Sequence, residues 1–512
     1  MDVLFLHTPK FHNYYKPIGD FSFILFPPIG LLGLADYLVR NHCSARIIHL
    51  GVEEHLHGPL DFDRMIDENR PAIVGLDLHW HFQSYDVIEV ARKIKLKHPE
   101  VAVLLGGFTA SVFAEEIVRD YPFIDFVIRG DAEIPILHLV RRFGRDKDLR
   151  SVPNLTYREN GSPVSNACSY AADGAMLDSL CFTDFTLMKD FPSFVRAFSR
   201  YVRMTGYSEA LQRRILGKRS TFPVVIGRGC AYECSFCGGS HEAHGLMAGR
   251  RTIALRSPNS VVASLSDLQR FGFDTAGLCH DCCPSEEGDQ YYIAIFEQLK
   301  QLKCPLSLQV ERYSLPGRGF LESFAGLPGK RSSIALSIHS HSEQLRRKNG
   351  VHRYSNGALE EMLAIADSLG VHVELYFACG LPFESVQDLK GMAVYQESLH
   401  KKFKHLRTRT ALIEIEPASP MSRQPDAYGL TLERATFAEF YRYHSQPANN
   451  HFQETGYVRC GLPGRDELRR FYCRHFCERI RAGAASPYIC SLIELSRHLG
   501  VLSALDQVVS LK

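Results

Sequence analysis

The stretch VVIGRGCAYECSFCGGS, residues 224–240, places three cysteines on a loop directly after a short apolar run. Cys230, Cys234 and Cys237 follow the spacing C-x3-C-x2-C. Thiolates are the ligands of iron–sulfur clusters, and three on one loop can hold three irons of a [4Fe–4S] cluster, leaving the fourth open. A structural zinc site normally has four ligands in paired spacings, and no second pair follows nearby. Zinc binding and unligated cysteines remain the alternatives.

The cysteine loop opens a region, residues 221–425, in which β-rich and helical segments alternate. We expect strands near 224–227, 275–280, 306–311, 333–338, 372–377 and 411–415. Six βα units predict a partial parallel (β/α)6 barrel, whose chemistry would lie at the carboxyl ends of the strands. The basic stretch KKFKHLRTRT, residues 401–410, is interpreted as a solvated surface, with phosphate or acidic-substrate binding as the alternative.

Residues 1–145 show an earlier α/β alternation, with strands expected near 3–7, 46–50, 73–78, 101–105 and 126–128. The runs AIVGLDL and VAVLLGG are apolar on both faces, as in a parallel sheet covered by helices on both sides. A flavodoxin- or Rossmann-like domain is therefore expected. Its ligand would lie beyond the carboxyl ends of the strands, at Pro9 and in segments 27–30, 79–84, 106–111 and 130–133.

The remaining segments are less informative. Residues 146–220 are interpreted as a junction that begins with a hairpin in NLTYRENGSPV and ends with a helical run over 194–216. Residues 426–512 are expected to form a helical carboxyl-terminal region, in which Cys473 and Cys477 lie one helical turn apart as core residues.

Composition limits the class of protein. The 512 residues are 45% hydrophobic and 23% charged, which is typical of a folded chain with several domains. The formal charge of +2 gives no indication of nucleic-acid binding. No signal segment or membrane span is recognisable, so a cytoplasmic location is expected, where the 15 cysteines favour metal or redox chemistry over disulfides.

The cysteine loop resembles the signature of the radical S-adenosylmethionine (SAM) superfamily, in which an aromatic residue, here Phe236, precedes the last cysteine. The segments GLPFES (380–385) and EPASP (416–420) are similar to family segments after the fifth and sixth strands. LCHDCC (278–283) and His339 depart from the pattern, because relatives often carry acidic residues there. The resemblance implies that the open iron chelates SAM. The implied SAM contacts are Phe236, Gly238, Gly239, Ser337, His339, Gly380 and Pro382.

Four segments before this core resemble the cobalamin-binding domain of the cobalamin-dependent radical SAM enzymes. They are PPIGLLGLADYLV, GLDLHWHFQSYD, LLGGFTAS and VIRGDAEIP, in that order. The implied cobalamin contacts are Pro28, Gly30, His79, His81, Ser84, Gly106, Gly107, Thr109, Ser111, Gly130 and Glu133. His79 and His81 are interpreted as residues of the corrin-facing wall, and direct contact with cobalt is the alternative.

The resemblance implies three cofactors, a [4Fe–4S] cluster, SAM and cobalamin. It favours C-methylation, in which a deoxyadenosyl radical abstracts hydrogen from an unactivated carbon and the substrate radical takes a methyl group from methylcobalamin. Cyclisation, ring contraction or oxidation with the same cofactors is the alternative, and a non-catalytic cobalamin or redox sensor is a third hypothesis. The substrate is a small molecule, a lipid or a peptide, and the electron donor a protein such as flavodoxin or ferredoxin. Cys279, Cys282 and Cys283 either pack, cap SAM or hold a second cluster.

Overall fold

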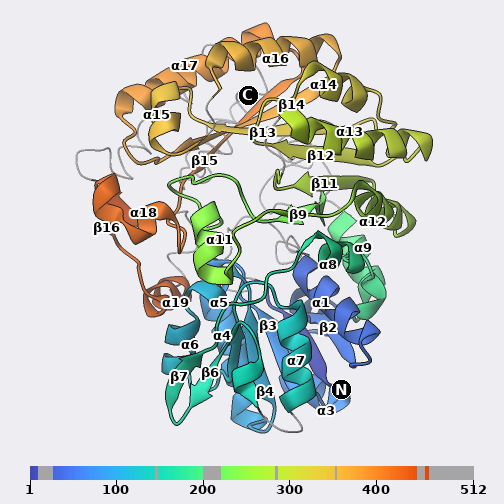
Figure 1. Cartoon of the computed structure of the whole chain (residues 1–512), viewed down its shortest axis with the longest axis vertical. Helices are drawn as coiled ribbons and strands as arrows, with labels where there is room; N and C mark the ends of the chain where they lie inside the picture. Colours follow the sequence, from blue (N-terminus) through green and yellow to red (C-terminus); the bar gives the residue numbers. More distant parts are fainter. Residues whose placement is uncertain are drawn as a thin grey trace.

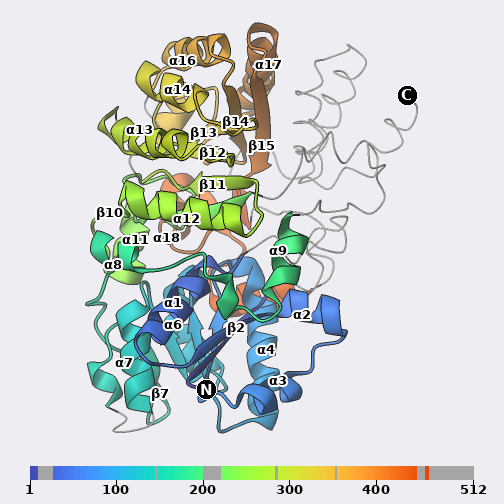
Figure 2. The ribbon, with the colours of Figure 1, turned by 90° about the vertical axis from the view of Figure 1, so that its right-hand side faces the viewer.

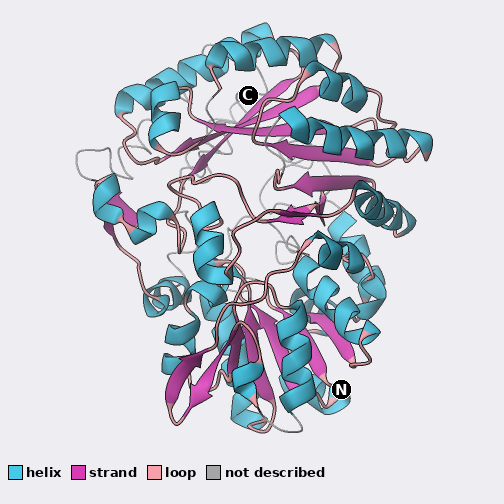
Figure 3. Ribbon diagram, in the orientation of Figure 1, coloured by secondary structure: helices cyan, strands magenta, loops and turns pink. Residues whose placement is uncertain are grey.

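The computed structural model describes residues 1–9, 27–143, 148–199, 221–282, 286–351, 354–446 and 456–459. Two α/β units are stacked along the long axis, each built on one large sheet (Figure 1). Helices cover the sheets and short loops connect them (Figure 3). Of the described helices, none is long and apolar enough to cross a membrane.

The first unit has a seven-stranded sheet in the order β2-β1-β3-β4-β5-β6-β7. Its strands are β1 (Val3–His7), β2 (Ala45–His49), β3 (Ile73–Asp77), β4 (Ala102–Gly106), β5 (Phe126–Ile128), β6 (Leu155–Glu159) and β7 (Ser162–Ser165). The first five strands pair in parallel. The order 2-1-3-4-5 is that of flavodoxin-like folds, so the predicted fold class is confirmed.

Helices and 3-10 turns connect these strands. They are α1 (Ile29–Arg40), α2 (Leu50–His57), α3 (Phe62–Asn69), η2 (His81–Gln83), α4 (Ser84–Lys97), α5 (Phe108–Val112), α6 (Ala114–Asp120), α7 (Glu133–Phe143) and η3 (Leu149–Ser151). The hairpin expected in residues 154–164 is present as β6 and β7, which pair antiparallel with each other. Strand β6 pairs with β5, so the first sheet extends past residue 145 into the segment interpreted as a junction.

The second unit has a six-stranded, all-parallel sheet in the order β15-β14-β13-β12-β11-β8. Its strands are β8 (Phe222–Val225), β11 (Thr275–Cys279), β12 (Ser307–Arg312), β13 (Ser333–His339), β14 (His372–Cys379) and β15 (Leu406–Leu412). The principal helices are α11 (His241–Ala248), α12 (Pro258–Arg270), α13 (Glu286–Gln301), α14 (Arg318–Ala325), α15 (Glu343–Lys348), α16 (Asn356–Ser368) and α17 (Val386–Lys402). Six parallel strands, curved and open at both edges, confirm the partial barrel (Figures 1 and 2).

The position predicted for the sixth strand is wrong. Strand β15 occupies Leu406–Leu412, so half of the basic stretch 401–410 lies inside the sheet and is not a solvated surface. Thr408 and Thr410 are buried and contact His400 and Gln396 of α17. Arg409 points to the opposite face, where its Nε donates to Glu374 at 2.9 Å. Threonine and arginine alternate with a period of two, which indicates a strand, but the positive charge of the segment favoured the prediction of a solvated surface.

The other segments join and flank the two units. They are α8 (Gly174–Ser179), η4 (Phe185–Leu187), α9 (Phe191–Ser199), β9 (Gly227–Arg228), β10 (Ala254–Leu255), α18 (Pro420–Arg423), η5 (Pro425–Tyr428), β16 (Leu430–Leu432), α19 (Phe437–Ser445) and β17 (Tyr457–Arg459). The described part of the carboxyl-terminal region is thus not wholly helical, because β16 pairs antiparallel with β17. Most of the helical run expected over 194–216, as well as Cys473 and Cys477, lies outside the described residues.

The two units share a hydrophobic core. One cluster of buried side chains runs from Val3 and Ile47 in the first sheet to Leu375 and Leu406 in the second. Phe185, which is fully buried between the units, contacts Phe222 and Phe271 edge to face at 5.4 and 4.9 Å. Burial of this kind stabilises the arrangement of the units as well as each unit.

Candidate functional site

The cysteine loop begins directly after β9 and is braced by other loops at the carboxyl ends of the second sheet. Ser235 is buried; its N–H donates to the carbonyl of Asn349 at 2.9 Å, and its carbonyl accepts from Met421 N–H at 2.8 Å. Ser240 then caps α11 through its hydroxyl, which accepts from Ala243 N–H at 3.3 Å. The loop is therefore held in one shape by residues far away in sequence.

The three cysteines of the loop are not in disulfides. In the part of the chain that the structure describes, the group of candidate metal ligands with atoms within 4.8 Å of one another is Glu53, His57 and Asp190, which does not include them. Backbone N–H groups of Tyr232 and Gly239 point at the sulfurs of Cys230 and Cys237, at 3.4 and 3.3 Å.

Burial disfavours thiolates at this site unless a cation compensates their charge. Burial, followed by the charges of Cys230 and Glu233, raises the pKa of Cys234 to about 12. The pKa of Cys237 is also raised, first by burial and then by Glu416 and Cys234. Irons would supply the missing positive charge, because metal binding requires and stabilises the deprotonated ligand.

The residues implied as SAM contacts gather around the cysteine loop. The ring of Phe236 lies 4.9 Å from that of His339, which takes a left-handed conformation (φ +63°) at the irregular end of β13. Burial lowers the pKa of His339 to about 4, so this histidine is neutral at pH 7. Ser337 lies two residues before it on β13, and the register with β14 shifts between the two.

Glycines line the approach to the loop. A side chain at Gly238 would lie 2.5 Å from the carbonyl oxygen of Pro417, so no larger residue fits there without a shift. Gly239 is the residue whose N–H meets Cys237. Gly380 has φ +89° and donates its N–H to Glu384 at 2.7 Å, and the carbonyl of Pro382 accepts from Asn349 at 3.0 Å.

Two half-buried carboxylic acids next to the loop were not predicted. Glu414 and Glu416 follow β15, and burial raises the pKa of each to about 7. Glu416 accepts a backbone hydrogen bond from Gly238, so it lies against the cysteine loop. The segment EPASP pointed to this place in the sequence, but the orientation of the carboxyl group depends on packing that the sequence does not reveal.

The segment after β11 braces the cysteine loop. His280 Nε2 lies 2.6 Å from the carbonyl oxygen of Gly229, and its Nδ1 lies 3.4 Å from the hydroxyl of Tyr313. A proton on Nε2 satisfies both contacts, because the carbonyl accepts and the hydroxyl donates. Cys279 is exposed, Cys282 is buried beside Gly227, and Cys283 lies outside the described residues. The structure therefore assigns a bracing role to His280 within this segment.

The implied cobalamin residues lie mainly along the carboxyl edge of the first sheet, which faces the second unit (Figure 1). Gly107 has φ +108°, and a side chain there would lie 2.7 Å from the carbonyl oxygen of Leu78. Thr109 donates its hydroxyl to the carbonyl of His79 at 3.0 Å, and Ser111 donates to Gly107 at 2.7 Å. Gly106 adjoins Gly107 at the end of β4.

The remaining residues of this set lie at the start of two helices. Gly30 is exposed in the first turn of α1, with open space where a side chain would be, and Pro28 precedes that helix. Ser84 is buried and donates its hydroxyl to the carbonyl of His81.

Aromatic rings cross the boundary between the two units. His79 packs on Phe108 with ring centroids 4.9 Å apart, and Phe108 packs on His244 of α11 at 5.3 Å. Burial lowers the pKa of both His79 and His244 to about 4, so both are neutral at pH 7. His81 is buried against α19, with its Nδ1 3.2 Å from Nε2 of His444. The part of the chain after the barrel thus covers one side of this edge.

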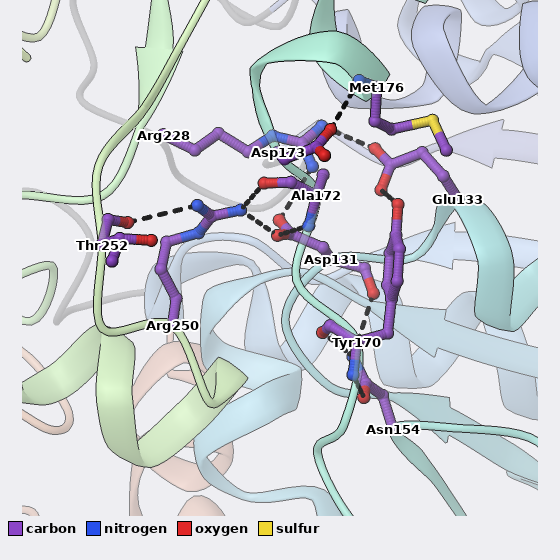
Figure 4. A network of polar contacts seen from close by, with 10 residues as sticks. All are labelled: Asp131, Glu133, Asn154, Tyr170, Ala172, Asp173, Met176, Arg228, Arg250 and Thr252. Carbon is purple, nitrogen blue, oxygen red and sulfur yellow. Dashed lines mark hydrogen bonds and ion pairs between the residues drawn. The ribbon is translucent and has the colours of Figure 1, made fainter.

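Gly130 and Glu133 lie at the joint between the units. Gly130 has φ +68°, and a side chain there would overlap Ala248 of α11. The carboxylate of Glu133 is buried and pairs with Arg228 at 2.7 Å (Figure 4). Glu133 therefore forms an ion pair with the segment that carries the cysteine loop.

Comparison with known proteins supports this two-unit reading. Residues 24–140 match the B12 binding domain family. The chain is 33% identical over 135 residues to an uncharacterised methyltransferase of Pyrococcus horikoshii, a match that covers 26% of this chain and 28% of the relative. It is 27% identical over 217 residues to hopanoid C-3 methylase of Methylococcus capsulatus, covering 42% and 36%. It is 22% identical over 246 residues to anaerobic magnesium-protoporphyrin IX monomethyl ester cyclase of Rubrivivax gelatinosus, covering 46% and 38%.

These matches span only about a third of each relative's length. The matches to solved structures cover a larger share of both chains. The radical SAM methyltransferase TsrM of Kitasatospora setae, with tryptophan and a SAM analogue bound, superposes with a TM-score of 0.66 at 15% identity, covering 100% of this chain and 99% of that one. The cobalamin-dependent radical SAM enzyme OxsB gives a TM-score of 0.66 at 13% identity, covering 92% and 66%.

Residues 24–140 thus match the B12 binding domain family, and the chain has the fold of the solved structures of TsrM and OxsB.

Proposed function

We propose that this protein is a cobalamin-dependent radical SAM methyltransferase that methylates an unactivated carbon of its substrate. When bound, the cluster and SAM supply a deoxyadenosyl radical and the cobalamin supplies a methyl group. Its curated relatives include proteins named methyltransferase and methylase, which supports methyl transfer. The substrate class, a small molecule, a lipid or a peptide, is left open.

The chain's own residues bind and orient these groups. Cys230, Cys234 and Cys237 would ligate three irons, and Phe236 and His339 would flank SAM. Burial holds the pKa of His79 near 4, so its imidazole would face the corrin in the uncharged form at pH 7. The aromatic contacts from His79 through Phe108 to His244 join the corrin-facing edge of the first unit to α11.

One observation carries the proposal: the cysteine loop and the carboxyl edge of the B12-binding domain face each other across a packed joint. Two cofactors bound at these places would act on one substrate. A reduced electron donor such as flavodoxin or ferredoxin would supply the electrons, which is consistent with a protein acting in the cytoplasm.

The direct test is SAM cleavage by the anaerobically reconstituted protein. We expect 5′-deoxyadenosine and S-adenosylhomocysteine as products, and Cys234→Ala should lower deoxyadenosine formation at least about 100-fold, because one cluster ligand is lost. Cys304→Ala is the matched control, since Cys304 is a buried cysteine away from the loop. Full cleavage of SAM by the Cys234→Ala variant would contradict the assignment of the loop.

A second function is favoured by one finding, the similarity to the cyclase of Rubrivivax gelatinosus. Cyclisation would use the same cofactors and would release deoxyadenosine without S-adenosylhomocysteine. The ratio of these two products in the assay above therefore separates methylation from cyclisation. A protein that binds both cofactors and releases neither product would be a sensor.

A further inference from the structure

One carboxylate of the first unit binds both ends of the segment that carries the cluster cysteines (Figure 4). Arg228 directly precedes the cysteine loop, and its Nη1 lies 2.8 Å from Oδ1 of Asp131. Arg250 follows α11, which ends the loop, and its Nη2 pairs with Oδ2 of the same aspartate. Residues 228–250 are therefore held at entry and at exit by Asp131.

Further hydrogen bonds hold the carboxylate of Asp131 in this orientation. Its Oδ2 also accepts from Ala172 N–H at 2.8 Å, and Arg250 donates to the carbonyl of Ala172. The side chains of Asp131 and Arg250 are 10% and 3% exposed. Although burial opposes ionisation, the charges of Arg228 and Arg250 lower the pKa of Asp131, so this carboxylate is charged at neutral pH.

The same aspartate belongs to the corrin-side edge of the first sheet. It lies three residues after the end of β5, and Gly130, directly before it, donates its N–H to Ser111 of α5 at 2.9 Å. Ser111 in turn bonds the carbonyl of Gly107. Two hydrogen bonds therefore link the glycine turn of the corrin edge to the backbone of Gly130, the residue directly before the aspartate that holds the cysteine segment.

We infer that Asp131 is a positioning residue that sets the separation between the corrin and the cluster. The inference rests on the proposed function, because it concerns the two cofactors that function requires. In this role Asp131 sets how the two units are positioned and is not needed to hold them together. The hydrophobic core shared by both units keeps them together without the ion pairs. Small errors of position are costly in such a site, because a displacement of about 1 Å can lower a rate by about 100-fold.

The variant Asp131→Asn tests the inference, because the amide keeps the size but loses the charge that both arginines need. Asp125→Asn is the matched control: Asp125 lies at the opposite end of β5, where it pairs with Lys95 at 2.8 Å, far from the cysteine loop. Asp131→Glu, which keeps the charge, should restore part of any loss.

The main readout is spectroscopic and needs no turnover. The protein is loaded with cobalamin and iron–sulfur cluster, and the magnetic interaction between the Co(II) and reduced-cluster spins is recorded by electron paramagnetic resonance. The dipolar coupling between two spins falls with the third power of the distance between them. We therefore expect Asp131→Asn to give a weaker coupling or a broader distribution of couplings. In Asp125→Asn the coupling should keep the wild-type value. Cobalt and iron contents should stay within about two-fold. An unchanged interaction in Asp131→Asn overturns the inference.

Activity gives the second readout. With a chemical reductant and SAM, we expect Asp131→Asn to lower S-adenosylhomocysteine release by about 100-fold relative to the wild type, with partial recovery in Asp131→Glu. Wild-type release by Asp131→Asn contradicts the inference. A wild-type protein that shows the spin interaction but releases no S-adenosylhomocysteine refutes methyl transfer and leaves the positioning role intact, so the two failures are distinguishable.

Discussion

At the scale of single residues, Phe383 is a large side chain on a backbone that favours glycine. It lies in the segment GLPFES and takes a left-handed conformation with φ +66°. The residue is 38% exposed, and its ring lies 5.9 Å from the ring of Tyr428 and 5.5 Å from Nζ of Lys348. An L-residue pays roughly 1–2 kcal/mol for this conformation, which the sequence could not show.

We expect Phe383→Gly to be more stable than Phe383→Ala by about 1 kcal/mol, because only glycine takes the left-handed conformation without cost. Both variants lose the same ring contacts, so the comparison isolates the backbone. Urea unfolding of the two apo variants measures the difference. Equal midpoints, or a more stable alanine variant, would argue against the strain.

Some features of the candidate site could be predicted from the sequence and others could not, because a motif reveals only residues that lie close together along the chain. The cluster cysteines were predicted because spacing on one loop is local information. Gly130 and Glu133 were predicted as cobalamin contacts, yet the structure engages Glu133 with Arg228, 95 residues away. Nothing in the sequence pairs those two charges, because ion pairs between units depend on how the units dock.

At the scale of secondary-structure elements, most strands of both sheets were predicted, because parallel strands buried on both faces are nearly continuous apolar runs. Strand β15 was misplaced because its exposed face carries Arg407 and Arg409, and those charges hid the alternation. The pairing of β6 with β5 was also missed, since a hairpin motif does not specify which sheet it extends.

The packing of α17 on β15 predicts a pH dependence of stability. Burial lowers the pKa of His400 to about 4, whereas an unfolded histidine has a pKa near 6.5. Below pH 6.5 the unfolded chain takes up a proton that the folded protein does not, so stability is lost as the pH falls from 6.5 toward 4. Between pH 7 and pH 5 this costs about 1–2 kcal/mol, after allowance for partial exposure.

Replacing His400 with Gln, which keeps a partner for Thr408, should remove that part of the acid sensitivity. Denaturant unfolding of wild type and His400→Gln at pH 7 and pH 5 provides the measurement. If both proteins lose the same stability on acidification, His400 is not neutral and buried as described.

At the scale of the whole molecule, the two units form one body around a shared core, and the ion pairs of Asp131 lie on the side where the cysteine loop meets the first sheet. Under the proposed function, the first unit would hold the corrin and the barrel would hold the cluster. Their fixed apposition would then bring both cofactors to one substrate.

The measurement that tests this account most directly is metal analysis of the protein reconstituted anaerobically with iron, sulfide and hydroxocobalamin, with absorption spectra as a check. We predict about four irons and about one cobalt per chain, because one cysteine loop and one corrin edge are present. Four irons without cobalt would contradict the two-cofactor account, and cobalt without iron would contradict the cluster assignment.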